Sequence, residues 1–316
     1  MTDSAGAYLI FFSQKVSPNV PRGTKLSPSA GNCLELRVDV LRSATTAQSC
    51  WGGSIGGFYC REAKMNLSEL SWPAIAELPR KTPIVLPIAA LEQHGRHLPV
   101  LTDTLLLGEV VRRVQQFPVA QQCLFAPVQW LGHSHHHLDF PGTLSLAGRH
   151  YIQMLQDMAR CWIEHGFSRV VFLNGHGGNI VPVQQALFEL KQEFRDYREL
   201  LLLSLTYWEA GGNPRESVSG LVQSQMGHAC EWETSMMLRL APQWVVGDIS
   251  QLPEVPFGTG FAPGYRAWVM PERSEPGHIG VPAAATSEKG EALFTFFARS
   301  VADFLERVVR WDGSWE

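Results

Sequence analysis

Residues 169–197 read RVVFLNGHGGNIVPVQQALFELKQEFRDY, and this stretch carries the pattern from which the fold can be predicted. Arg169–Leu173 is an apolar run with no polar residue in its interior, which is typical of a strand buried in a parallel sheet. A glycine-rich loop follows, and a helix is predicted over Ile180–Tyr197. A buried strand, a loop and a helix in this order predict one unit of an α/β protein.

The same alternation extends to both sides of this stretch. Further strands are predicted over Pro83–Ala89, Leu124–Trp130 and Leu200–Thr206. Further helices are predicted over Asn66–Leu78, Thr102–Val114, Ala147–His165, Cys230–Leu240 and Glu288–Val309. We therefore expect a three-layer α/β/α fold with a mostly parallel central sheet, in which ligands bind beyond the carboxyl ends of the strands.

The composition of the chain excludes several classes of protein. Of its 316 residues, 45% are hydrophobic and 18% are charged, which favours a folded protein with a sizeable core. The formal net charge of −4 provides no basic surface for nucleic acid, and no apolar run approaches the roughly 18–20 residues that span a membrane. Six scattered cysteines without CxxC spacing argue against a zinc finger or a disulfide framework. We expect a cytoplasmic protein that binds neither nucleic acid nor membranes.

The first 64 residues differ from the rest of the chain. Segments such as Ser43–Ser49 and Trp51–Gly57 are rich in Ser, Thr, Ala and Gly and show little periodicity. A single folded domain is predicted over residues 65–316. Residues 1–64 are either an extension upstream of a true start at Met65 or a genuine but poorly ordered tail.

A carboxylate and an imidazole follow the predicted strand Pro83–Ala89 directly. Glu92 and His94 are two residues apart, so in an extended segment their side chains leave the same face. Asp103 begins the next predicted helix, near the same strand end, where it could bridge two ions. An isolated acidic residue at a helix start is more often a cap, but the three residues together indicate a site for Zn²⁺, Mn²⁺ or Fe²⁺.

A second cluster, Asn174–Asn179, follows the predicted strand Arg169–Leu173. Its three glycines permit a tight turn and close approach of a ligand, and His176 is its one imidazole. A glycine-rich loop before a helix could instead cradle phosphate, but this one lacks the spacing and the lysine of a P-loop.

A third cluster lies at the start of the predicted helix Cys230–Leu240. His228 and Glu231 are three residues apart and share a helix face, whereas Glu233 projects elsewhere. One of the two glutamates is therefore expected to be a solvated or capping residue, and the pattern leaves open which one.

Five ordered motifs resemble the creatininase (creatinine amidohydrolase) family. They are Leu86-Pro87 with Glu92–Gly95, His97–Pro99 and Thr102–Thr104; Phe140–Thr143; Asn174–Asn179; His228-Ala229 with Glu233–Ser235; and Gly277–Pro282 leading to Glu288–Gly290. The similarity covers about residues 66–309. It implies an α/β fold with a central parallel sheet, a dinuclear metal site and, commonly, a homo-oligomer that is a hexamer.

The resemblance also implies roles for individual residues. Glu92, Asp103 and His176 would hold one metal ion, and His94 and Asp103 would hold the other, with Asp103 as the bridge. Glu233 would close the site as a ligand or as a proton shuttle. His228 would contact the substrate or an intermediate.

The substrate pocket is predicted less completely. His137 precedes Phe140–Thr143 at the spacing seen in the family and is expected to line the pocket, as is Gly177. Trp208 follows the predicted strand Leu200–Thr206 and is expected either to wall the pocket or to lie in the core. Four imidazoles of an extended segment could not converge on one ion, because alternate residues face opposite ways. The other three histidines of this segment are therefore interpreted as surface or packing residues: His133, His135 and His136.

The sequence departs from true creatininases at two places. Gly177 and Gly178 stand where those enzymes carry a tyrosine and a metal-ligating glutamate, and Ser224 replaces a tryptophan four residues before His228. The Gly-Gly form resembles the wider family, which includes formylamide hydrolases and a peptide-trimming protease of mycofactocin maturation.

The predicted activity is metal-dependent hydrolysis of a C–N amide bond other than a peptide bond, in a small molecule such as a cyclic amide. Two divalent ions, with Zn²⁺ preferred over Mn²⁺ or Fe²⁺, would activate a water molecule and polarise the carbonyl. Glu233 or His228 would move the proton to the departing nitrogen. The alternatives are hydrolysis of a formamide or a peptide bond, and a non-catalytic protein that binds a metal or another ligand.

Overall fold

Four parallel strands form the central sheet of the computed structural model, which describes residues 65–258, 260–261 and 263–315. The predictions for residues 1–64 lie outside this range. The strands are β1 (Ile84–Ile88), β2 (Leu124–Phe125), β3 (Arg169–Asn174) and β4 (Leu201–Thr206), in the spatial order β2-β1-β3-β4. Ile88 pairs with Asn174, and Asn174 pairs with Thr206. The carboxyl ends of β1, β3 and β4 therefore lie level with one another.

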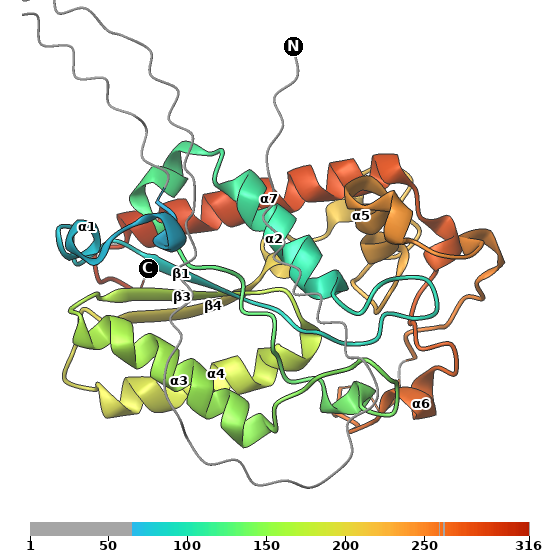
Figure 1. The fold of residues 1–316 in the computed structure, drawn as a ribbon, viewed down its shortest axis with the longest axis horizontal. Coiled ribbons are helices and arrows are strands. Elements are labelled where there is room, and N and C mark those ends of the chain that lie inside the picture. The colour runs from blue at the N-terminus through green and yellow to red at the C-terminus, as the bar shows by residue number, and fades with distance from the viewer. Residues whose placement is uncertain (1–64, 259, 262, 316) are drawn as a thin grey trace, which may run out of the picture. The chain divides into compact units, whose positions relative to one another are not determined.

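Helices cover both faces of the sheet (Figure 1). One face carries α2 (Thr102–Val114), α5 (Glu231–Leu240) and α7 (Ser287–Arg310), and the other carries α3 (Gly148–Glu164) and α4 (Ile180–Glu193). Side chains of β1 alternate between the two hydrophobic cores, with Val85 on the α2, α5 and α7 side and Ile84 on the other. The predicted three-layer α/β/α fold is confirmed.

The remaining helices are short. Two are α-helices, α1 (Trp72–Ala76) and α6 (Met270–Arg273). The 3₁₀ turns are Leu67–Glu69, Pro118–Gln122, His135–His137, Gly177–Asn179, Tyr207–Glu209, Pro214–Glu216, Pro242–Trp244, Ile249–Gln251 and Pro282–Ala284.

Proline explains two differences from the predicted elements. Asn66–Leu78 is not one helix, because the chain extends at Leu70 and Ser71 and starts again as α1, with Pro73 in its first turn. The strand predicted over Leu124–Trp130 is regular only at β2. Ala126 and Gln129 still donate hydrogen bonds to β1, but Pro127 lies between them and has no N–H to donate. The helix predicted over Ile180–Tyr197 ends earlier, at Glu193.

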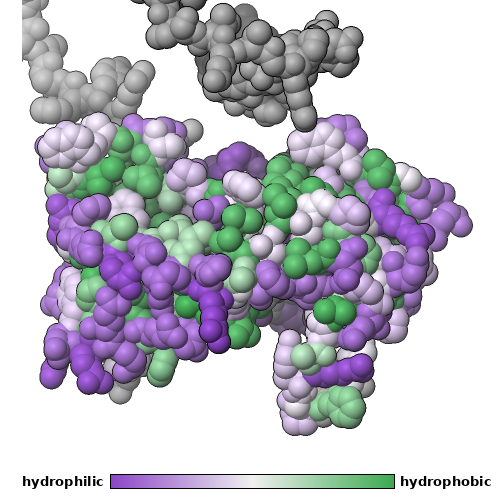
Figure 2. Space-filling view, turned by 60° about the horizontal axis from the view of Figure 1, so that its bottom comes forward, coloured by the Kyte–Doolittle hydropathy of each residue, from purple (hydrophilic) through white to green (hydrophobic). Residues whose placement is uncertain are grey.

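On the face shown in Figure 2, hydrophilic residues are interspersed with smaller hydrophobic areas. Arg160 of α3 forms ion pairs with Asp157 and with Glu193 of α4, and these pairs give the outer surface of the two helices its charged character. Within the described residues, no helix is both long enough and apolar enough to cross a membrane.

Candidate metal centre

The loops that follow β1 and β3 meet at the carboxyl edge of the sheet. The loop after β1 turns back on itself, with hydrogen bonds from the Leu98 N–H to the His94 carbonyl and from the Glu92 N–H to the Val100 carbonyl. Gly95 makes this turn at a φ of +64°, a conformation that glycine adopts without steric cost. The loop then leads into α2, where Asp103 lies in the first turn.

Four buried side chains converge at this edge. His94 Nε2 lies 3.0 Å from Asp103 Oδ1, and His176 Nδ1 lies 2.9 Å from Asp103 Oδ2 and 3.4 Å from Glu92 Oε1. Glu92, His94 and Asp103 each offer one ligand atom within 4.8 Å of the others. The structure thus brings together all four side chains that the sequence marked as candidate ligands.

The two imidazoles are held by backbone carbonyls. His94 Nδ1 lies 3.1 Å from the carbonyl oxygen of Glu92, and His176 Nε2 lies 3.1 Å from that of His133. Because a carbonyl oxygen can only accept a hydrogen bond, these nitrogens carry the proton in the contact. His94 Nε2 and His176 Nδ1 face the carboxylates, which is how metal-binding histidines are commonly oriented.

The grouped charges shift the pKa values of these side chains. Burial alone would lower the pKa of His176, but Glu92 and Asp103 raise it to about 10. Burial would raise the pKa of Asp103, yet His94 and His176 bring it below its usual value. Burial raises the pKa of Glu92 in spite of the neighbouring His176. In the absence of a cation, His176 therefore holds a proton that a bound metal would displace.

A divalent cation fits this arrangement. Oε2 of Glu92 is buried and has no hydrogen-bonding partner among the described residues. Burying a carboxylate oxygen costs free energy unless a hydrogen-bond donor or a cation interacts with it. Two carboxylates and two imidazoles are a donor set that Zn²⁺, Mn²⁺ or Fe²⁺ accepts.

Glu233 and His228 flank the four side chains. Glu233 is the third residue of α5, where Oε2 accepts a hydrogen bond of 3.3 Å from the Cys230 N–H and Oε1 lies 3.8 Å from His94 Nε2. His228 Nε2 donates to the carbonyl of Gln93 at 2.8 Å, and its Nδ1 lies 3.5 Å from Glu92 Oε1. Burial, followed by the charges of His94 and His137, holds the pKa of His228 well below its usual value. His228 is therefore a neutral imidazole whose unprotonated Nδ1 faces the centre.

A strained residue separates His228 from helix α5. Ala229 is buried and has a φ of 45°, a conformation that costs a residue other than glycine about 1–2 kcal/mol. Hydrogen bonds in both directions between the main chains of His228 and Ile279 hold the segment in place. Backbone strain that neighbouring contacts hold in this way often occurs at functional sites.

The structure separates the two glutamates that the sequence left undecided. Glu231 is fully buried, accepts hydrogen bonds from the N–H groups of Val222 and Gln223, and pairs with Lys289 Nζ at 2.7 Å. Glu231 is therefore neither a solvated residue nor a cap. Its ion pair with Lys289 joins α5 to the start of α7. Glu233 is the predicted capping residue, because its Oε2 accepts from the Cys230 N–H at the start of α5, and its Oε1 also faces the candidate centre.

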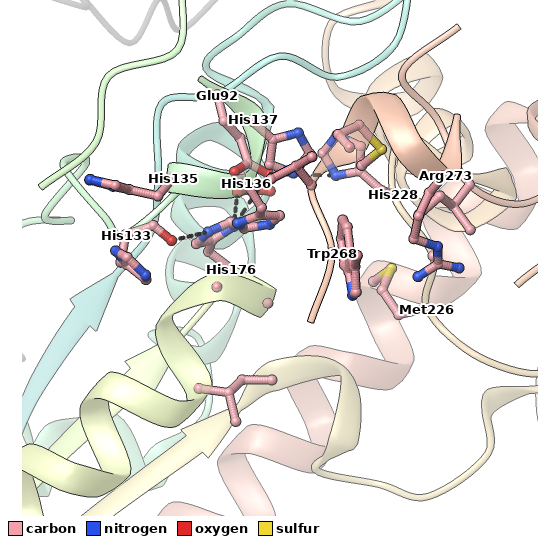
Figure 3. Close-up of a pocket in the computed structure, with 18 of the residues that line it drawn as sticks. Glu92, His133, His135, His136, His137, His176, Met226, His228, Trp268 and Arg273 are labelled. Carbon is pink, nitrogen blue, oxygen red and sulfur yellow. Dashed lines mark hydrogen bonds and ion pairs between the residues drawn. The ribbon is translucent and has the colours of Figure 1, made fainter. Parts of the chain in front are cut away.

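The interpretation of the histidine segment requires correction. Residues 135–137 are a 3₁₀ turn rather than an extended strand, so alternate side chains do not face opposite ways. His133, His135, His136 and His137 all line the same cavity (Figure 3). His135 is exposed there, so the predicted surface position holds for this residue. His136 is only partly exposed, and its ring lies 4.2 Å from that of His137 and 5.9 Å from that of His176, measured between ring centroids.

The centre opens into a cavity of about 1030 Å³. The three residues predicted for the pocket, His137, Gly177 and Trp208, all line it. Trp208 also packs against the core beside Tyr207. It therefore contributes both to the pocket wall and to the core, the two positions that the sequence left open. In Figure 3, Trp268, Met226 and Arg273 face the histidines from the opposite side of the cavity.

Sequence reasoning missed several residues of the site. Gln93 lies between two candidate ligands, and its Nε2 lies 2.7 Å from His137 Nδ1 and donates to the Gly277 carbonyl at 2.9 Å. Its place in the Glu92–Gly95 motif was the available signal. Trp268 and Arg273 carried no such signal, because only the folded chain brings Trp268 against His136, more than 100 positions earlier, and Arg273 against Trp268.

Comparisons with known proteins agree with this geometry. A family model described as creatinine amidohydrolase (creatininase) matches residues 68–305. The mycofactocin precursor peptide peptidase of Mycobacterium tuberculosis (strain CDC 1551 / Oshkosh) is 33% identical over 262 residues, which cover 78% of this chain and 92% of that protein. The creatinine amidohydrolase of Pseudomonas putida is 31% identical over 234 residues, which cover 70% of this chain and 87% of that protein.

Solved structures show the same fold. A mutant creatininase complexed with creatine superposes with a TM-score of 0.67 at 27% identity, covering 79% of this chain and 100% of that one. A Zn–Zn type of mutant creatininase and a creatininase described with Mn each give a TM-score of 0.66, at 28% and 27% identity and with the same coverage.

Proposed function

Because this chain belongs to the creatininase family, we propose that it is a metal-dependent hydrolase that cleaves the amide bond of a peptide-like substrate. The observation that carries the proposal is the buried cluster of Glu92, His94, Asp103 and His176, of which Glu92, Asp103 and His176 line a cavity of about 1030 Å³. A cavity of this volume lies at the upper end of the range that encloses drug-sized ligands, and a small cyclic amide would occupy little of it.

We propose that the centre holds two divalent ions, with Zn²⁺ as the first candidate and Mn²⁺ or Fe²⁺ as alternatives. Glu92, Asp103 and His176 would hold one ion. His94, Asp103 and Glu233 would hold or face the other, since His94 Nε2 points toward both carboxylates. Support comes from the unpartnered Oε2 of Glu92 and from related creatininases solved in Zn–Zn and Mn forms.

Metal ions bound here would supply Lewis acidity, which lowers the pKa of water and polarises an amide carbonyl. The amide nitrogen is a poor leaving group and needs a proton as the bond breaks. Glu233 is placed to hold that proton, because Oε1 faces the centre while Oε2 is fixed by the Cys230 N–H. Neutral His228 would accept a hydrogen bond from the substrate at Nδ1, since its Nε2–H is already donated to Gln93.

The nature of the substrate is the finer part of the proposal. The sequence favoured a bond other than a peptide bond, but the large cavity and the 33% identity to peptide peptidases favour a peptide. The apolar wall formed by Met226 and Trp268, with the Arg273 guanidinium 4.9 Å from the Trp268 ring centroid, offers surface for side chains of a peptide. The second candidate is a cyclic amide, which the 31% identity to a creatinine amidohydrolase supports.

The test is a substrate panel of short peptides, formamides and cyclic amides, assayed after metal removal and after addition of Zn²⁺, Mn²⁺ or Fe²⁺. We expect peptide hydrolysis that chelation abolishes and one of these ions restores. Glu233→Gln should lower kcat by about 10²–10⁴-fold, the usual contribution of a general acid or base. Hydrolysis of cyclic amides alone would replace the proposed substrate class, and ligand binding without turnover of any amide would indicate a non-catalytic protein.

A further inference from the structure

Residue 178 cannot supply a ligand to the centre. A Cβ atom built on Gly178 would lie 2.2 Å from the His133 carbonyl oxygen, 2.4 Å from His176 Nε2 and 2.9 Å from His136 Cε1. The first of these neighbours is backbone, which does not move aside at low cost. At Gly177, by contrast, a Cβ would meet no atom within 4 Å.

His136 occupies the space beside Gly178. The 3₁₀ turn His135–His137 brings its ring over the cavity, nearly parallel to the His176 ring with 17° between the planes (Figure 3). Trp268 packs against it edge to face, with ring centroids 5.2 Å apart. The rings of His137, His176 and Trp268 thus contact this imidazole and orient it.

The nitrogens of His136 are available for a ligand. Within residues 65–258, 260–261 and 263–315, neither nitrogen of His136 takes part in a hydrogen bond, whereas His133, His135 and His137 each have a partner at Nδ1. A partly buried, oriented imidazole without a polar partner is unusual next to three other histidines that are all satisfied.

His136 also lies within reach of the candidate metal ligands. Glu92, His136 and His176 each offer one ligand atom, and these atoms lie within 4.8 Å of one another. We propose that His136 is a metal ligand, completing with Glu92, Asp103 and His176 the coordination of the first of the two ions. The inference rests on the proposed metal centre and adds to it a ligand from a third loop.

A ligand set of two imidazoles and two carboxylates at this ion has a consequence for metal choice. Imidazole suits Zn²⁺ and Co²⁺, whereas Mn²⁺ and Mg²⁺ prefer oxygen. The loss of His136 should therefore weaken Zn²⁺ and Co²⁺ binding more than Mn²⁺ binding.

The test compares His136→Ala with His135→Ala in the full-length protein. His135 lies in the same turn and lines the same cavity, but it is exposed and contacts Ser145 Oγ at 2.7 Å. Each metal-free variant is titrated with Zn²⁺ against a competing chelator and with Co²⁺ while its visible absorption is recorded. Far-ultraviolet circular dichroism of the metal-free variants checks that both are folded.

We expect His136→Ala to weaken the tighter Zn²⁺ site by at least about tenfold and to change the Co²⁺ spectrum, with His135→Ala close to wild type. His136→Cys, which supplies a thiolate ligand in place of the imidazole, should recover part of the affinity. Wild-type Zn²⁺ affinity and an unchanged Co²⁺ spectrum in folded His136→Ala would overturn this inference alone. Failure of the wild-type protein to bind either ion would overturn the proposed metal centre, and this inference with it.

Discussion

At the scale of single residues, Asp103 has the most demanding position in the site. One of its oxygens lies 3.0 Å from His94 and the other 2.9 Å from His176, so it is the carboxylate that connects the two imidazoles. Its place in the first turn of α2 fixes the backbone from which it reaches both. A bridging role for one carboxylate requires this geometry.

Replacement of Asp103 by alanine should therefore remove both metal ions. The expected result is fewer than about 0.2 metal equivalents per chain by elemental analysis after dialysis, because each ion loses a charged ligand. Asp139→Ala is a suitable control, since Asp139 is an exposed acidic residue just after the His135–His137 turn. Two equivalents retained by Asp103→Ala would contradict the bridging role.

At the scale of elements, the pair of Glu231 and Lys289 holds α5 against α7. Glu231 is fully buried, whereas the Lys289 side chain is 15% exposed and also donates to the Ala284 carbonyl. Helix α5 carries Glu233, so this pair helps to position a carboxylate of the candidate centre from outside that centre.

Lys289→Met should lower the free energy of unfolding by about 3 kcal/mol or more, because it leaves a buried carboxylate without its counter-ion. Urea unfolding monitored by circular dichroism measures this change. Arg310→Met, which breaks the exposed ion pair with Glu306 on the same helix, should cost less than about 1 kcal/mol. Equal and small effects of the two substitutions would show that the buried pair does not anchor α5.

At the scale of the whole molecule, the parallel sheet and the grouping of Glu92, His94, Asp103 and His176 could be predicted from the sequence. The apolar runs at β1 and β3 and the polar residues directly after them locate the candidate metal centre, because parallel strands end at one edge. The irregular end of β2 depends on Pro127, and the break before α1 depends on Pro73. A prediction from hydrophobic periodicity alone takes no account of either proline. The hexamer, the cytoplasmic location and the interpretation of residues 1–64 stay predictions.

The proposed role of His136 could not be predicted from the sequence for a different reason. Whether consecutive histidines alternate or gather on one side depends on local backbone torsion, and the chain here adopts a 3₁₀ turn. Trp268 and Arg273, which line the cavity opposite the histidines, lie more than 100 positions after His136 in the sequence. Only the folded chain brings Trp268 against the ring of His136.

The folded metal-free protein should become less stable as the pH rises above neutrality. The pKa of His176 is raised from 6.5 to about 10 in the folded state, so its pairing with Glu92 and Asp103 stabilises the protein fully below about pH 6.5. That contribution is lost as the pH rises toward about 10. We expect Tm of the metal-free protein to fall over this range and the Tm of the Zn²⁺-loaded protein, whose imidazole is already unprotonated, to fall less.

The control for this pH dependence is His176→Gln, which lacks the titrating group. Its metal-free form should lose less stability between about pH 6.5 and 10 than the metal-free wild type. The same decline of Tm in both proteins would assign the pH dependence to other groups.

The central claim is that the side chains gathered after β1 and β3 form a dinuclear metal centre. A crystal structure of the Zn²⁺-loaded protein, with anomalous data collected on both sides of the zinc absorption edge, tests it directly. We expect two anomalous peaks with Asp103 between them. Glu92 and His176 should also bind one of the two ions, and His94 should bind the other. A structure loaded with excess Zn²⁺ that shows no peak among these four residues would contradict the account.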